Sequence, residues 1–225
     1  MELKGLADFI IGLYGPDGTL LKDKDKGLSE TGLYKVDLNS SKGATQANMT
    51  GLAPTVTKVY GSNAVAEQNI GTPSPAIALA ANDIPHTIYD KTVGLEKDEV
   101  NTGYAARPGQ TSMGGVIVHS QSADGTVDAY MAFPQGTITP GEMNLQTNTE
   151  NPVSVHDALT LSTQARGSDK LMYQKFYSDE PNFDYEKMLA FIFPGYVAKT
   201  TSEAAQTSGS SEAAGSTPKT DSTTA

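Results

Sequence analysis

A tight turn between two apolar segments constrains the fold of this chain more than any other feature. Asp124-Gly125, a pair favoured in two-residue turns, separates Gly115–His119 from Thr126–Phe133. In the second segment the residues alternate between two faces: Val127, Ala129, Met131 and Phe133 on one, and Thr126, Asp128, Tyr130 and Ala132 on the other. This pattern predicts an antiparallel hairpin with one face buried and the other facing water or a partner.

The composition favours strands and turns over a helical bundle. The 225 residues include no Trp and 22 Gly, and 37% of them are hydrophobic, which is enough for one core or one core with an appendage. The chain has no cysteine. This excludes disulfides, thiolate metal sites and cysteine nucleophiles together.

Further strands and two short helices can be placed along the chain. We expect strands at residues 5–14, 32–38, 76–81, 155–165 and 171–177, and a turn at 15–18 with 19–21 pairing back across it. A helix at 84–94 is predicted to be capped by Asp83 and stopped by Gly94. A second helix is expected to begin at Phe183-Asp184 and to end at Pro194-Gly195. The fold class is therefore mainly β (α+β), similar to a sandwich or barrel, with one or two short flanking helices.

Two segments are too polar to belong to the core. Residues 39–75 contain few large apolar side chains, and a long excursion of this kind is usually functional or disordered. Residues 199–225 are rich in Ser, Thr and Ala and have no large apolar residue, so we expect a disordered tail after a domain spanning 1–198.

Motifs for catalysis or metal binding are missing from the sequence. His86, His119 and His156 are more than thirty residues apart and show no metal-ligand spacing, so they are interpreted as a first-turn surface residue and two strand residues. No phosphate loop, dinucleotide fingerprint or Gly-x-Ser-x-Gly elbow occurs. We expect no enzymatic activity, no cofactor and no metal.

The charge and the apolar runs bear on partners and on location. A net charge of −10 argues against a surface that grips phosphates. The simplest explanation is solubility; the alternative is a negative lumen that repels DNA and leaves it free to slide. The first apolar stretch is too short for a signal peptide, and no run has the length of a membrane span. These observations predict a soluble product that is made and assembled in a cytoplasm.

The order of the elements is itself informative. The chain presents Tyr60-Gly-Ser-Asn63, Glu67, a small-residue strand at 76–81, the helix at 84–94, the hairpin at 115–133, then Thr137-Ile-Thr-Pro-Gly-Glu142 and Leu159–Ala165. This order, across roughly residues 5–195, resembles the major tail protein of long-tailed, non-contractile phages of Gram-positive hosts. The resemblance implies a tail tube fold and a virion protein that does no chemistry and assembles as stacked rings of six, through which DNA is ejected without specific binding.

The resemblance also implies roles for particular residues. The segment 40–71 would be an arm that reaches the next ring, with the candidates Ser40, Lys42, Asn48, Thr57, Tyr60 and Glu67; a floppy surface loop is the alternative. Candidates for the lumen are Asp128, Tyr130, Thr160, Ser162 and Gln164, although alternation alone does not choose the face.

The implied partners are further copies of the chain, a tape-measure protein, a tip or initiator complex and a tail terminator. One departure is Gln135-Gly136-Thr137, where relatives tend to have a basic residue, which leaves open whether this edge makes the same contact between subunits. Two other classes stay open: another β-rich virion component, such as a head decoration or tail-completion protein, and a bacterial surface adhesion module.

Overall fold

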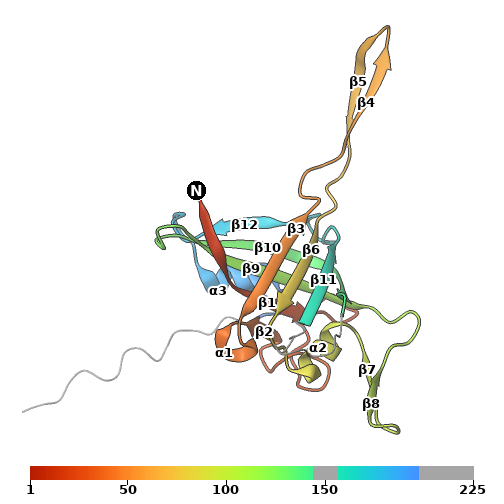
Figure 1. The fold of residues 1–225 in the computed structure, drawn as a ribbon, viewed down its shortest axis with the longest axis vertical. Coiled ribbons are helices and arrows are strands. Elements are labelled where there is room, and N and C mark those ends of the chain that lie inside the picture. The colour runs from red at the N-terminus through yellow and green to blue at the C-terminus, as the bar shows by residue number, and fades with distance from the viewer. Residues whose placement is uncertain (144–156, 198–225) are drawn as a thin grey trace, which may run out of the picture.

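The predicted hairpin lies at the centre of the sheet. In the computed structural model, which describes residues 1–143 and 157–197, it consists of β9 (Ser112–Ser122) and β10 (Asp128–Pro140). Around it one antiparallel sheet has the order β2-β1-β9-β10-β11-β6-β3, with β12 also pairing β10 (Figure 1). The remaining strands of this sheet are β1 (Leu3–Leu13), β2 (Leu33–Val36), β3 (Ala44–Thr50), β6 (Ala76–Ala81), β11 (Asp157–Thr163) and β12 (Gln174–Tyr177). The mainly β fold class is confirmed.

The strand β10 is long enough to pair with two different strands on the same side. Its first half pairs with β12 from Ala129 to Ala132, and its second half pairs with β11 from Gly136 to Pro140. Its pairing with β9 shifts register between Phe133 and Gly136. A bulge at this position increases the local twist, so the sheet can curl.

The curled sheet has a core on each face. Inside the curl lie Phe9, Ile11, Val36, Ile77, Leu79, Val116, Phe133, Ile138, Leu159 and Leu161. On the other face, α3 (Tyr185–Ile192) covers Ile10, Ile117, Tyr130 and Ala132. The expectation that the second face of the hairpin meets water or a partner is therefore wrong, because a helix distant in sequence packs on it.

The two predicted helices form, but their caps differ from each other. The helix α3 begins after Asp184, as predicted, and Asp184 caps it by accepting hydrogen bonds from the backbone N–H groups of Glu186 and Lys187. The helix α2 (His86–Thr92) begins after Pro85 with no side-chain cap. Asp83 instead forms an ion pair with Lys42, so its predicted capping role is wrong. Gly94 follows α2 with φ +79, which confirms the left-handed stop.

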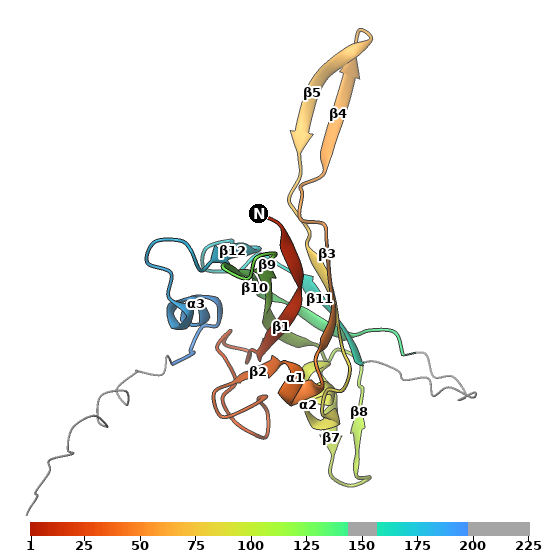
Figure 2. The same cartoon turned by 60° about the vertical axis from the view of Figure 1, so that its left-hand side comes forward.

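The segment 39–75 is ordered rather than a long loop. It contains the end of a four-residue helix, α1 (Leu38–Ser41), the whole of β3, and a two-stranded hairpin of β4 (Val56–Gly61) and β5 (Ala64–Ile70). Figures 1 and 2 show this hairpin projecting from one end of the body. A second small hairpin, β7 (Glu96–Asp98) and β8 (Gly103–Ala105), was not predicted and extends from the opposite end.

Some expectations concern residues outside the described ranges. The start of the predicted strand at 155–165, including His156, and the predicted disordered tail at 199–225 belong to them. Among the described residues, no helix is long and apolar enough to cross a membrane.

Candidate assembly surfaces

One face of the sheet carries small, uncharged side chains in cross-strand rows. Thr139, Thr160, Ala78 and Asn48 lie opposite one another across four strands, and so do Thr137, Ser162, Ala76 and Thr50. We call this surface the neutral face; its members are Gln46, Asn48, Thr50, Ala76, Ala78, Ala80, Thr137, Thr139, Ala158, Thr160 and Ser162. The alternate residues of the same strands, such as Ile77, Leu79, Leu159 and Leu161, fill the core behind it.

The projecting hairpin is a second surface without cover. None of the residues in β4 or β5 is buried. Its turn is Ser62-Asn63, both with positive φ, which matches the primed turns of two-residue hairpins. Large apolar side chains are exposed along it, namely Val56, Val59, Tyr60, Val65 and Ile70. A two-stranded hairpin is marginal in water by itself, so contact with a partner would stabilise it.

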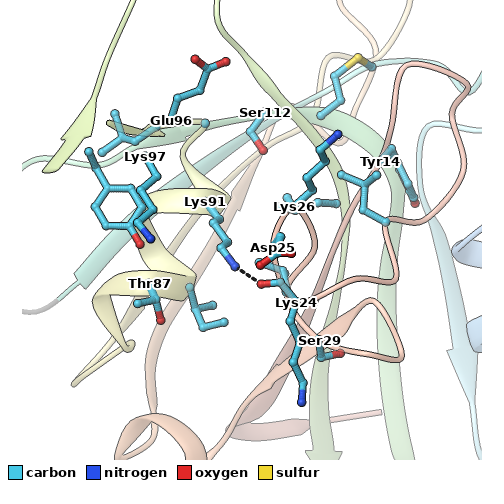
Figure 3. A pocket seen from close by; sticks show the side chains of 18 of the residues that line it. Tyr14, Lys24, Asp25, Lys26, Ser29, Thr87, Lys91, Glu96, Lys97 and Ser112 are labelled. Atoms are coloured by element: carbon cyan, nitrogen blue, oxygen red, sulfur yellow. Dashed lines mark hydrogen bonds between the residues drawn. The ribbon is translucent and has the colours of Figure 1, made fainter. Parts of the chain in front are cut away.

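A cavity lies at the other end of the molecule. It has a volume of about 1450 Å³ and is walled by the loop 21–31 on one side and by α2 and β7–β8 on the other. Buried Leu13 and Leu28 contribute to its floor. Figure 3 shows Lys91 of α2 reaching across to the loop, where its ammonium group donates to the carbonyl oxygens of Lys24 and Gly27. This bridge ties the two walls together.

A polar cluster, in which Asp8 is buried and His119 and Asp128 are half-buried, joins β1, β9 and β10. The Nδ1 atom of His119 lies 3.0 Å from Asp8 Oδ2, and its Nε2 atom lies 3.0 Å from Asp128 Oδ1. Lys35 of β2 also pairs with Asp8, at 3.0 Å. The His119 ring stacks on Tyr130, with 4.6 Å between the ring centroids. Both ring nitrogens face carboxylate oxygens, so the imidazolium form satisfies both contacts as a donor.

The pKa values in this cluster follow from burial and hydrogen bonds. Burial acts to lower the pKa of His119, but the hydrogen bonds to Asp8 and Asp128 outweigh it, so the pKa lies above the ordinary 6.5. Burial acts to raise the pKa of Asp8, and the hydrogen bonds from His119 and Lys35 reverse this and lower it. Hydrogen bonds from Gln121 and His119 lower the pKa of Asp128.

This cluster is a structural element of the core. No nucleophile lies beside the histidine among its hydrogen-bond partners. In the part of the chain that the structure describes, no group of three His, Cys, Asp or Glu side chains is placed to hold a metal ion. His119 is a strand residue and His86 is exposed in the first turn of α2, as the sequence predicted.

The candidate arm residues divide between two places. Thr57, Tyr60 and Glu67 lie on the projecting hairpin. Ser40 lies in α1, where its hydroxyl group hydrogen-bonds the backbone N–H of Asp37, and Asn48 lies in β3. Lys42 follows α1 and pairs with Asp83. The projecting part is therefore shorter than 40–71, because β3 joins the main sheet.

The candidate lumen residues also divide. Thr160 and Ser162 lie on the neutral face, and exposed Gln164 follows the end of β11. Tyr130 is covered by α3 and is only 9% exposed, while Asp128 hydrogen-bonds His119. Alternation placed Tyr130 on a polar face, and no local pattern indicated that a distant helix would cover this face.

Sequence reasoning missed the contribution of β3 and the cavity. Gln46, Asn48 and Thr50 alternate with Ala47 and Met49, which is a strand signal that the polar composition of the segment obscured. No signal could have revealed the cavity, because its walls come together only in the fold.

These surfaces define a class of protein. The described residues present a neutral sheet face, an uncovered hairpin and a cavity at the far end, and they lack a constellation for metal binding. That profile is typical of a structural subunit whose surfaces serve assembly. In agreement, the family model described as phage tail tube protein matches residues 1–201, and the chain belongs to this family. A search of curated proteins gave no match. Proteins of this family are structural components of the virion tail and not enzymes.

Proposed function

We propose that this chain polymerises as stacked rings of six around a central channel through which DNA leaves the virion. The projecting β4–β5 hairpin carries the proposal, because its residues are all uncovered in the single subunit. A protein can leave such a surface open when a second copy covers it in the assembly. The number six comes from the resemblance to the family.

The neutral face supports a channel lining. Its rows of Thr, Ser, Asn, Gln and Ala offer no Lys or Arg to DNA phosphates, and cationic side chains are what give nucleic-acid binding its affinity. A wall of this kind would let a duplex slide. The proposed lining is uncharged and not negative, so it differs from the repulsive lumen that the net charge suggested.

The edges of the sheet support growth around the ring. Among the described strands, β2 and β3 end the strand order, and they and β12 each have one partner in the sheet. An open edge invites pairing with another chain. Contacts between unlike surfaces can close into a ring around an axis and repeat openly along it, which gives a tube. The tape-measure protein, the tip complex and the terminator would set where this repetition starts and stops.

Electron microscopy of the purified protein over a concentration series tests the proposal. We expect rings or tubes with a central hole and sixfold symmetry. A Ser162→Cys variant labelled with a small gold cluster should show density inside the hole, since the chain has no other thiol. Assemblies without a channel would support a head decoration protein, and label on the outer wall would reject the neutral face as the lining.

A further inference from the structure

We infer that the cavity between the loop 21–31, α2 and β7–β8 receives the tip of the β4–β5 hairpin from a second copy of the chain. This inference rests on the proposed function, because it names the site at which the hairpin of one ring would bind the next ring. It identifies which surface of the neighbouring subunit the hairpin meets.

The arrangement of the two surfaces suits repetition along an axis. The hairpin projects at one end of the longest dimension of the molecule, and α2 with β7–β8 lies at the other end (Figures 1 and 2). A tip at one end and a cavity at the opposite end are unlike surfaces. Their contact would place successive copies head to tail, which continues without limit.

The chemistry of the tip matches the cavity. Tyr60 is 70% exposed and lies opposite Val65 near the turn, so the tip of the hairpin presents one aromatic and one aliphatic side chain. The cavity has an apolar floor, to which Leu13, Leu21, Leu28, Ile88, Leu95 and Met113 contribute. Buried tyrosines in apolar pockets are among the strongest anchors of protein interfaces.

The charges of the two surfaces also suit each other. The lining of the cavity contains four lysines and four carboxylates, which balance: Lys24, Lys26, Lys91, Lys97, Asp25, Glu30, Glu96 and Glu99. The hairpin carries Lys58 and Glu67, which also balance. Because the whole chain has a net charge of −10, two copies repel each other over most orientations. A contact between the hairpin and the cavity, each of which carries equal numbers of positive and negative side chains, avoids that repulsion.

The cavity is formed before any partner arrives. Lys91 joins α2 to the loop through two backbone carbonyl groups, and Lys24 pairs with Glu30 within the loop at 2.7 Å. The Lys91 bridge ties the loop to α2 and so fixes the spacing between the walls, whereas the exposed Lys24–Glu30 pair lies within the loop wall alone. A binding site that is already formed loses less conformational entropy when the partner binds, so the affinity is higher.

Disulfide cross-linking in the full chain tests the inference, because the natural sequence has no cysteine. The variant Ala64→Cys, Thr87→Cys has one thiol beside the hairpin turn and one at the exposed cavity wall on α2. Disulfides require Cα atoms within about 7 Å, so only a seated tip can bridge them. The matched control is Ala64→Cys, Ser168→Cys, whose second thiol lies in an exposed loop outside the cavity.

We expect oxidation of the assembled protein to shift the cavity variant from monomer to a ladder of dimers, trimers and larger products on a non-reducing gel, with the control remaining monomeric. Tubes that form without the ladder would show that the hairpin tip does not bind in the cavity, and they would leave the proposed function standing. A ladder of equal strength in the control would also contradict binding of the tip in the cavity, because the cross-link would then not be specific to it. A protein that neither assembles nor cross-links at high concentration would overturn both.

Discussion

At the scale of single residues, His119 is a half-buried polar side chain that joins several elements of the fold. It connects three strands by contacting Asp8 on β1 and Asp128 on β10, with Lys35 of β2 beside Asp8 and Tyr130 stacked on its ring. Tyr185 of α3 also packs against Tyr130, with 5.7 Å between the ring centroids. The protonation state of His119 therefore affects how firmly these elements are joined.

The direction of the pKa shifts gives a pH dependence of stability. The pKa of His119 is raised above 6.5, so its contribution is full below about pH 6.5 and is lost as pH rises through the raised value. The pKa values of Asp8 and Asp128 are lowered below 3.8, so their contribution is lost only as pH falls through those lowered values. The cluster is thus most stabilising between about pH 4 and about pH 6.5.

His119→Gln should remove the alkaline part of this dependence. We expect the variant to lose about 1.5–3 kcal/mol of unfolding free energy near pH 5.5, because hydrogen bonds to charged groups have that value, and to lose less near pH 9. Urea unfolding at both pH values measures this, with exposed His86→Gln as the control. An equal loss at both pH values would contradict the assignment of a protonated imidazole.

Gly114 is constrained by a neighbouring backbone. A Cβ atom at this position would lie 2.4 Å from the carbonyl oxygen of Gly12 on the adjacent strand, which cannot rotate away. The close backbone approach explains why a glycine occupies this place in β9, where strands otherwise disfavour it.

Gly114→Ala is expected to destabilise the fold by about 1–3 kcal/mol through overpacking. Gly103→Ala is the matched control, because nothing lies within 4 Å of its Cβ position and its φ is not in the left-handed region. Thermal unfolding of both variants measures the difference. Equal melting temperatures would show that β1 and β9 can separate to accommodate the methyl group.

At the scale of elements, the segment 39–75 shows where sequence reasoning reached its limit. Its polar composition predicted a loop, but β3 pairs with β6 and contributes Gln46, Asn48 and Thr50 to the neutral face. Strands with one exposed face and an edge position need few large apolar residues, so composition alone underestimates them. Deleting all of 40–71 would therefore remove a strand of the main sheet.

A shorter deletion isolates the hairpin. Removing residues 53–72 together with the substitution Pro73→Gly leaves two residues between Gly51 and Ser74, whose N–H already donates to the Gly51 carbonyl at 3.2 Å. The new connection then has the form of a β-turn with glycine at its third position, where proline would be disfavoured. We expect a folded subunit, with a melting temperature near that of the full chain, that does not form tubes. Circular dichroism and electron microscopy measure the two properties. Long tubes from this variant would exclude the hairpin as the contact between rings.

Tyr60 tests the hairpin with a single substitution. If its side chain anchors the contact between rings, Tyr60→Ala should raise the critical concentration for assembly by about 30-fold or more, which corresponds to a hot-spot loss of at least about 2 kcal/mol. Sedimentation of assembled protein measures the critical concentration. Thr57→Ala, which removes a small exposed side chain from the same strand, is the control. A change of the same size in both variants would argue against an aromatic anchor.

At the scale of the whole molecule, net charge opposes assembly. Each copy has a net charge of −10, and exposed charges repel across a Debye length of about 8 Å at physiological ionic strength. The neutral face, the hairpin and the cavity are all balanced or uncharged. We infer that the acidic charge is kept away from the proposed contacts.

Salt should therefore promote assembly. Raising NaCl from about 20 mM to about 200 mM shortens the screening length and weakens the repulsion between copies, so the critical concentration should fall. Light scattering over a salt series measures it. A critical concentration that rises with salt would show that ion pairs between subunits, and not apolar contacts, hold the tube together.

Residues that are close together in the chain set the local elements of the fold. The hairpin at Asp124-Gly125, the start of α3 at Asp184 and the stop at Gly94 are set by backbone preferences of residues close together in the chain, and all three were predicted. The order of the elements also indicated the family that the comparison confirmed.

Packing between distant segments sets which faces of the strands are covered. Tyr130 is buried because α3, more than fifty residues later, packs on it. Thr160 is only half-buried and Ser162 is exposed, although both show the same alternation. The cavity likewise depends on a loop and a helix that are far apart in the chain. Alternation specifies that a strand has two faces, but long-range packing determines which of them a distant element covers.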